Sequence, residues 1–118
     1  MPKTVLIADD SAFMRRWLKD MLQESRYNVI SEAKDGYEAV QKYKQHLPDI
    51  VIMDLVMPKL DGIGALKEIK AFHPSAVVIM CTATGQKATI VEAIQNGASE
   101  FIIKPNFQHL IPILQKVG

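Results

Sequence analysis

The stretch TVLIADDS, residues 4–11, carries the pattern that decides the fold. Its first five residues include four apolar ones, which is typical of a strand buried in a core. The run then ends in two adjacent carboxylates, Asp9 and Asp10, with no basic residue beside them. Two such charges about 4 Å apart, at an effective dielectric near 20, repel by roughly 4 kcal/mol. The pattern predicts a buried strand whose end lies at a site that compensates negative charge.

Apolar runs of this kind recur along the chain and alternate with segments of helical period. Continuous apolar strands in strict alternation with helices predict a mostly parallel sheet covered on both faces. With right-handed crossovers, the leading candidate is an α/β fold of the doubly wound type, (βα)5, a three-layer sandwich. Strands are expected at residues 4–8, 28–33, 49–54, 76–83 and 100–105, and helices at 12–24, 37–46, 63–72, 86–95 and from 109 or 110 to the end.

The first expected helix has an apolar stripe and a basic face. Ser11 is the predicted N-cap. Arg15, Arg16 and Lys19 fall outside the stripe and are expected to face solvent. The stripe itself comprises Phe13, Met14, Trp17, Leu18, Met21 and Leu22.

Composition limits the class of protein. The chain has 118 residues, 48% hydrophobic and 23% charged, with a net charge of +1. We expect a single domain over residues 1–118. The near-neutral balance favours neither nucleic acid nor a membrane surface as partner. One cysteine excludes an internal disulfide, and the N-terminal apolar run is too short for a signal peptide, so we expect a cytoplasmic protein.

Polar residues end the predicted strands. Asp9 and Asp10 end the first, Asp54 the third, Thr82 the fourth and Lys104 the fifth. Since the carboxyl ends of parallel strands share one edge, these side chains are expected together. Three carboxylates need a cation, and hard oxygen ligands favour Mg²⁺; without metal, one carboxylate should have a raised pKa. Asp54 is the best candidate nucleophile toward a phosphoryl group, whose other oxygens Thr82 and Lys104 would bind.

At these positions the sequence resembles the response-regulator receiver domain. The similar motifs are ADDS (8–11), MDLVMPKLDG (53–62), CTA (81–83) and FIIKP (101–105), in order and over essentially the whole chain. The motifs DDSAFMR, EAKDGYEAVQKY and TGQ are most similar to the single-domain chemotaxis regulators of that family. The resemblance implies a flavodoxin-like fold with strand order 2-1-3-4-5.

The resemblance also implies roles at the strand ends. Asp54 matches the phosphoacceptor, and Asp9 and Asp10 match the acidic pair that holds Mg²⁺ directly or through water. Val56 matches the position whose backbone carbonyl binds the metal. The family catalyses only its own phosphorylation and slow autodephosphorylation, so we do not expect an enzyme in the ordinary sense.

Further matches concern the switch. Thr82 matches the switch hydroxyl, Phe101 the aromatic that turns inward on activation, and Lys104 the lysine that pairs with the phosphoryl group. The bond between Lys104 and Pro105 is expected to be cis. The chain departs from the family pattern after Pro105, where Asn106 precedes Phe107, and it carries Pro112 in the last helix.

The implied partners are proteins. They are a histidine kinase of the CheA type, a flagellar switch protein of the FliM type on the face of the fourth helix, fifth strand and fifth helix, and a phosphatase. A monomer is expected. A phosphorelay receiver, or a receiver from a longer regulator, is the nearest alternative.

Two alternatives come from other classes. Phosphatases with an aspartyl-phosphate intermediate usually carry a second Asp where this chain has Val56. Flavodoxin-like electron carriers have a hydroxyl-rich phosphate loop, whereas the stretch DDSAF is acidic and would repel phosphate.

Overall fold

The computed structural model describes residues 2–23, 25–83, 85–104 and 106–117. Strands and helices alternate along the chain, as the sequence predicts, and most boundaries lie within two residues of those expected. The elements are β1 (Lys3–Ala8), α1 (Ala12–Leu22), β2 (Tyr27–Ala33), α2 (Gly36–His46), β3 (Ile50–Asp54), α3 (Gly62–Phe72), β4 (Val78–Thr82), α4 (Lys87–Gln95), β5 (Glu100–Ile103), a 3₁₀ turn η1 (Phe107–His109) and α5 (Leu110–Val117).

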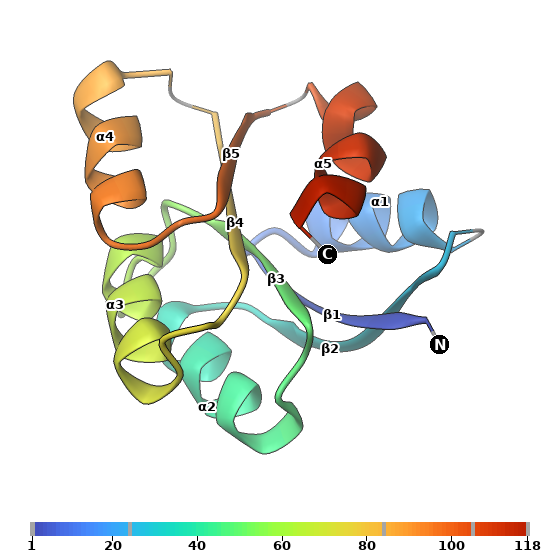
Figure 1. The fold of residues 1–118 in the computed structure, drawn as a ribbon, viewed down its shortest axis with the longest axis horizontal. Helices are drawn as coiled ribbons and strands as arrows, with labels where there is room; N and C mark the ends of the chain where they lie inside the picture. The colour runs from blue at the N-terminus through green and yellow to red at the C-terminus, as the bar shows by residue number, and fades with distance from the viewer. Residues whose placement is uncertain (1, 24, 84, 105, 118) are drawn as a thin grey trace.

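The five strands form one parallel sheet in the order β2-β1-β3-β4-β5. Helices α2, α3 and α4 cover one face, and α1 and α5 cover the other (Figure 1). This confirms the doubly wound α/β sandwich and its flavodoxin-like strand order. Strand β3 lies at the centre of the sheet, and β2 lies at an edge, where its residues alternate in exposure.

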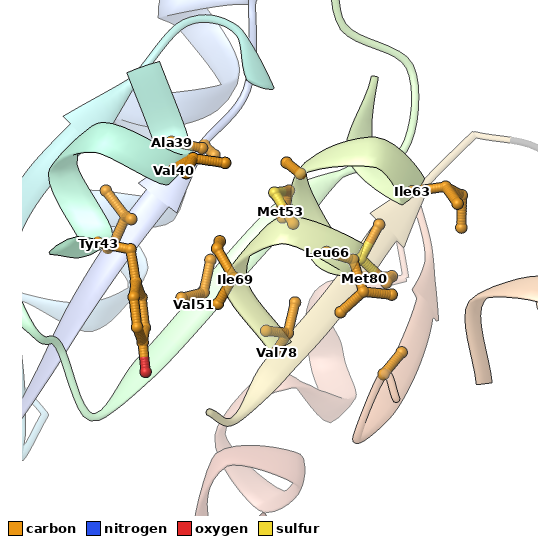
Figure 2. Close-up of a cluster of buried hydrophobic side chains, with 14 of the residues drawn as sticks. Ala39, Val40, Tyr43, Val51, Met53, Ile63, Leu66, Ile69, Val78 and Met80 are labelled. Carbon is orange, nitrogen blue, oxygen red and sulfur yellow. The ribbon is translucent and has the colours of Figure 1, made fainter. Parts of the chain in front are cut away.

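Each face of the sheet has its own apolar cluster because the central strands are buried on both sides. Val51 and Met53 of β3 point to the α2–α3 side, where they meet Leu66 and Ile69 of α3 (Figure 2). Ile50 and Ile52 belong to the opposite cluster, under α1 and α5. Successive side chains of β3 point to opposite faces of the sheet, and both faces are covered. This explains why the sequence of β3 is continuously apolar up to Asp54.

The ends of the helices follow local chemistry. Ser11 caps α1, since its hydroxyl accepts a hydrogen bond from the Met14 amide at 3.2 Å. The 3₁₀ turn η1 precedes α5, so Pro112 falls in the first turn of that helix, where a missing amide hydrogen costs little. Gly97 has φ of +101° after α4, a left-handed conformation that suits glycine at a helix end.

The predicted apolar stripe of α1 is partly wrong. Leu18 and Leu22 are buried, but the side chain of Phe13 is 75% exposed and that of Trp17 is 37% exposed. The Trp17 ring packs against the Phe107 ring, with ring centroids 5.3 Å apart in an edge-to-face arrangement. The stripe is therefore wider than the surface that the sheet can cover. Within the described part of the chain, no helix is both long and apolar enough to cross a membrane.

Candidate functional site

The predicted polar residues meet at the carboxyl edge of the sheet. Asp9 follows β1, Asp54 ends β3, and Thr82 ends β4. All three are buried, whereas Asp10 is exposed. Asp9, Asp10 and Asp54 each offer a carboxylate oxygen, and these oxygens all lie within 4.8 Å of one another. The parallel topology therefore brings together three acids that come from two strands.

Lys104 supplies part of the compensation that the acidic pair requires. Its Nζ lies 2.6 Å from Oδ2 of Asp9 and 3.4 Å from Oδ1 of Asp54. The backbone amide of Lys104 donates to the carbonyl of Thr82 at 2.7 Å, which continues the β4–β5 pairing and brings the lysine to the site. One ammonium thus bridges two buried carboxylates.

The pKa values of Asp54 and Lys104 are both shifted. Burial raises the pKa of the Asp54 carboxyl; the charge of Lys104 opposes this and that of Asp9 adds to it, with a raised value as the result. Burial lowers the pKa of Lys104, but its hydrogen bond to Asp9 and the nearby Asp54 charge outweigh burial and raise it. The raised pKa of one carboxylate agrees with the prediction for a metal-free acidic site.

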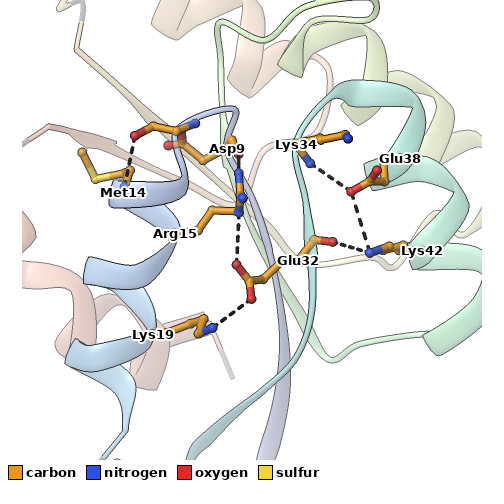
Figure 3. Close-up of polar contacts among 9 residues, drawn as sticks. Asp9, Met14, Arg15, Lys19, Glu32, Lys34, Glu38 and Lys42 are labelled. Atoms are coloured by element: carbon orange, nitrogen blue, oxygen red, sulfur yellow. Dashed lines mark hydrogen bonds and ion pairs between the residues drawn. The ribbon is translucent and has the colours of Figure 1, made fainter.

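The backbone and side chain of Asp9 are held from several directions. Its amide donates to the Ala33 carbonyl at 2.9 Å, and its Oδ1 accepts from the Ser11 amide at 2.9 Å. Its carbonyl accepts from Nη1 of Arg15 at 2.7 Å, while Nε of Arg15 pairs with Glu32 at 3.0 Å (Figure 3). The sequence reasoning missed the roles of Arg15 and Glu32.

The prediction of a solvated basic face on α1 is therefore only partly right. The Arg16 side chain is 80% exposed, but that of Arg15 is 18% exposed. Lys19 pairs with Glu32 at 2.9 Å. No signal in the helical period distinguishes Arg15 from Arg16, because the partner of Arg15, Glu32, lies 17 residues away on β2.

The loop after β3 packs closely against the phosphoacceptor candidate. The Gly62 amide donates to the Leu55 carbonyl at 2.8 Å. A Cβ on Gly62 would meet the Asp54 carbonyl oxygen and would lie 2.8 Å from Leu55 Cα. Only glycine allows the start of α3 to approach the end of β3 this closely.

The remaining predicted residues lie around the same edge. Val56 follows Asp54 by two positions, with its side chain 67% exposed and a backbone hydrogen bond to the Asp54 carboxylate. Phe101 lies on β5, partly buried against the α2–α3 cluster. The predicted cis bond from Lys104 to Pro105 lies outside the described residues.

The donor set fits a hard divalent cation. Carboxylate oxygens from Asp9, Asp10 and Asp54 are close enough to share one ion, and all are hard ligands. Mg²⁺ suits such a site because it keeps several waters and pairs with phosphate oxygens. The exposure of Asp10 leaves one side of the cluster open to solvent.

Comparisons with known proteins found a matching family model and close relatives. A model of the response regulator receiver domain matches residues 5–115. The chain is 51% identical over 120 residues to the chemotaxis protein CheY of Thermotoga maritima, which covers 100% of this chain and 99% of that protein. It is 51% identical over 105 residues to CheY of Bacillus subtilis, which covers 89% of this chain and 88% of that one.

Solved structures are similar as well. The fold matches a crystal structure of the CheX–CheY–BeF3–Mg²⁺ complex from Borrelia burgdorferi with a TM-score of 0.95 and 39% identity, covering 99% of this chain and 90% of that chain. It also matches the response regulator domain of Thermotoga maritima CheB with a TM-score of 0.89 and 40% identity, covering 99% and 94% of the two chains.

Proposed function

Because this chain belongs to the response regulator receiver family, as its motifs predicted, we propose that it is a phosphorylation-dependent switch. In this proposal residues 1–118 act as one regulatory receiver domain of a two-component system in the cytoplasm. Asp54 accepts a phosphoryl group from a histidine kinase, and the output is protein binding. Chemotaxis is the proposed circuit, since the CheY proteins of two bacteria are about half identical to this chain.

The observation that carries the proposal is the position of Asp54. Its carboxylate is buried at the end of the central strand, within reach of the Lys104 ammonium and close to Asp9 and Asp10. An Asp54 oxygen forms a bond to phosphorus while the bond from phosphorus to the donor imidazole breaks. Lys104 then pairs with the added negative charge.

Asp9, Asp10, Asp54 and the Val56 carbonyl are the groups that would hold Mg²⁺. When bound, the ion would neutralise charge that develops on the phosphoryl oxygens. The chain's own contribution is placement. Lys104 and the Ser11 amide orient the Asp9 carboxylate. The close packing of Gly62 against Asp54 and Leu55 holds the loop that carries Val56.

Thr82 and Phe101 are the proposed switch residues. Thr82 is buried beside the site, on the strand that pairs with β5. A phosphoryl group on Asp54 would attract the Thr82 hydroxyl, and Phe101 would fill the space behind it. Such a change biases two arrangements of the surface formed by α4, β5 and α5.

The proposed partners are a histidine kinase of the CheA type and a flagellar switch protein of the FliM type. The α4–β5–α5 surface supports binding, since Val91, Ile94 and Ile103 are apolar and 41%, 48% and 38% exposed. A relative in the Borrelia complex binds another protein, CheX. A FliM-type peptide is expected to bind the phosphorylated form more tightly, and equal affinity for both forms would contradict this output.

Incubation with acetyl phosphate tests the chemistry. Intact mass is measured with and without Mg²⁺ for the wild type, Asp54→Asn and the control Asp20→Asn, whose side chain is exposed. The gain of one phosphoryl mass is expected with Mg²⁺ in the wild type and the control, and not in Asp54→Asn. No gain in any sample, or a gain that survives Asp54→Asn, would overturn the proposal.

A further inference from the structure

The acidic pair is supported by an arginine that the proposed phosphoryl transfer does not itself use. We propose that Arg15 is a positioning residue: its hydrogen bond to the Asp9 carbonyl fixes the Asp9–Asp10 peptide so that both carboxylates converge with Asp54 on one cation. This inference rests on the proposed function, since it concerns the Mg²⁺ site of that function.

Arg15 makes two directed contacts from one planar group. Nη1 donates to the Asp9 carbonyl at 2.7 Å, and Nε donates to Oε1 of Glu32 at 3.0 Å (Figure 3). A guanidinium held at two nitrogens has a defined plane, which a flexible ammonium would not have. The Arg15 side chain is only 18% exposed, so these contacts are shielded from water.

Glu32 is itself anchored, which makes it a fixed support for Arg15. Its second carboxylate oxygen pairs with Nζ of Lys19 at 2.9 Å, and its backbone carbonyl accepts from Nζ of Lys42 at 2.7 Å. Burial raises the pKa of Glu32, but the hydrogen bonds from Lys19 and Arg15 outweigh burial and lower it. Glu32 is therefore ionised at neutral pH and binds the Arg15 guanidinium. Its contacts join β2 to α1 through Arg15 and Lys19, and to α2 through Lys42.

The hydrogen bond from Arg15 to the Asp9 carbonyl is the contact that affects the position of Asp10. The other polar groups of Asp9 already have partners: Ala33 for the amide, the Ser11 amide for Oδ1 and Lys104 for Oδ2. The carbonyl belongs to the peptide that leads into Asp10, so its direction determines where the Asp10 side chain starts. Rotation of that peptide would separate the acids without unfolding β1.

The two roles that Arg15 could have, as a nearby positive charge or as a positioning group, predict opposite effects of its removal on Mg²⁺ binding. If Arg15 acted only as a nearby positive charge, its removal would strengthen Mg²⁺ binding, because cations repel. If Arg15 positions the acids, its removal weakens binding. Groups that orient metal ligands typically contribute 10-fold to 100-fold to affinity.

The test is calorimetric titration of the phosphate-free protein with Mg²⁺, beside urea unfolding. The variants are Arg15→Met and the control Arg16→Met, which removes the same charge from the next position, where the side chain is 80% exposed. Arg15→Met is expected to raise the Mg²⁺ dissociation constant about tenfold. Arg16→Met is expected to leave it within about twofold, because its exposed charge is screened.

The outcomes separate the two proposals. An unchanged or lower dissociation constant in Arg15→Met, or an equal rise in Arg16→Met, would overturn the positioning role while the Mg²⁺ site stands. If the wild type binds no Mg²⁺, the metal site and the inference both fail. Should Arg15→Met not fold, Glu32→Gln runs the same test. It leaves Arg15 in place and removes the negative charge that pairs with Arg15 and Lys19, and about a threefold rise in the dissociation constant is expected.

Discussion

Helices α3 and α4 lie on the same face of the sheet, yet they are attached to it very differently. Helix α4 buries Ala93, and its Val91 and Ile94 are 41% and 48% exposed. Asp61 caps α3 by accepting from the Gly64 amide at 2.8 Å. The buried residues of α3 are Gly62, Ile63, Ala65, Leu66 and Ile69.

The difference fits the two tasks of the proposed switch. Each large apolar side chain that is fully buried stabilises the folded state by about 1.5–3 kcal/mol, so α3 is held far more firmly than α4. Helix α3 follows the loop after Asp54, and its first residue, Gly62, packs against the backbone of Asp54 and Leu55. In the proposed switch, a small change in free energy at the site would be enough to move α4, because elements with few buried contacts open most easily.

The largest expected effect comes from the α3 core. Leu66→Ala should lower the free energy of unfolding by about 3 kcal/mol, because Leu66 is fully buried between α3 and the sheet and its loss leaves a cavity. Urea denaturation with a fixed m-value measures this. A loss below about 1 kcal/mol would show that α3 is no better anchored than α4.

Two glycines at the starts of these helices give a matched pair. Gly62→Ala should cost about 2 kcal/mol, since its Cβ would press on the backbone of Asp54 and Leu55. Gly85→Ala, before α4, should change stability by less than about 0.5 kcal/mol, since the nearest atom, Cδ1 of Ile103, is 3.4 Å from the added Cβ. Equal losses in urea unfolding would remove the distinction between the two helices.

Charge removal at the site should stabilise the metal-free protein. Burial and Asp9 raise the pKa of Asp54 above its ordinary 3.8, so the ionised form opposes folding at neutral pH and this cost is relieved as pH falls through the folded pKa. Asp54→Asn should gain about 1 kcal/mol at pH 7, after the attraction of Lys104 is subtracted. The gain should vanish below the ordinary pKa.

Urea midpoints of the wild type and Asp54→Asn, compared from neutral to acid pH without Mg²⁺, measure this effect. Asp20→Asn is the control, because its carboxylate is 62% exposed. A lower midpoint for Asp54→Asn at pH 7 would mean that Lys104 over-compensates the acids.

The smallest stability effect is expected on the exposed side of α4. Ile94→Ala should change the free energy of unfolding by less than about 0.5 kcal/mol, because the side chain is already half exposed. The same substitution should weaken binding of a FliM-type peptide to the phosphorylated form, measured by fluorescence anisotropy. Unchanged peptide affinity, with Val91→Ala also without effect, would place the output on another surface.

The order of elements and most of the site could be predicted from the chain itself. Continuous apolar runs determine buried parallel strands, and parallel strands must end at one edge. The meeting of Asp9, Asp10 and Asp54 follows from topology, with no knowledge of side-chain contacts. The 3.6-residue period likewise determined the helices, and Pro112 correctly placed the start of α5.

Tertiary structure decided what periodicity cannot encode. Phe13 and Leu18 belong to one apolar stripe in sequence, but the sheet covers Leu18 and leaves Phe13 exposed. Arg15 and Arg16 are adjacent and chemically equal, yet Glu32 on β2 selects Arg15. The sequence by itself determines which helices and strands form, because the patterns that specify them are local. Which side chains meet is decided only when the elements pack, because that brings together residues far apart in the sequence.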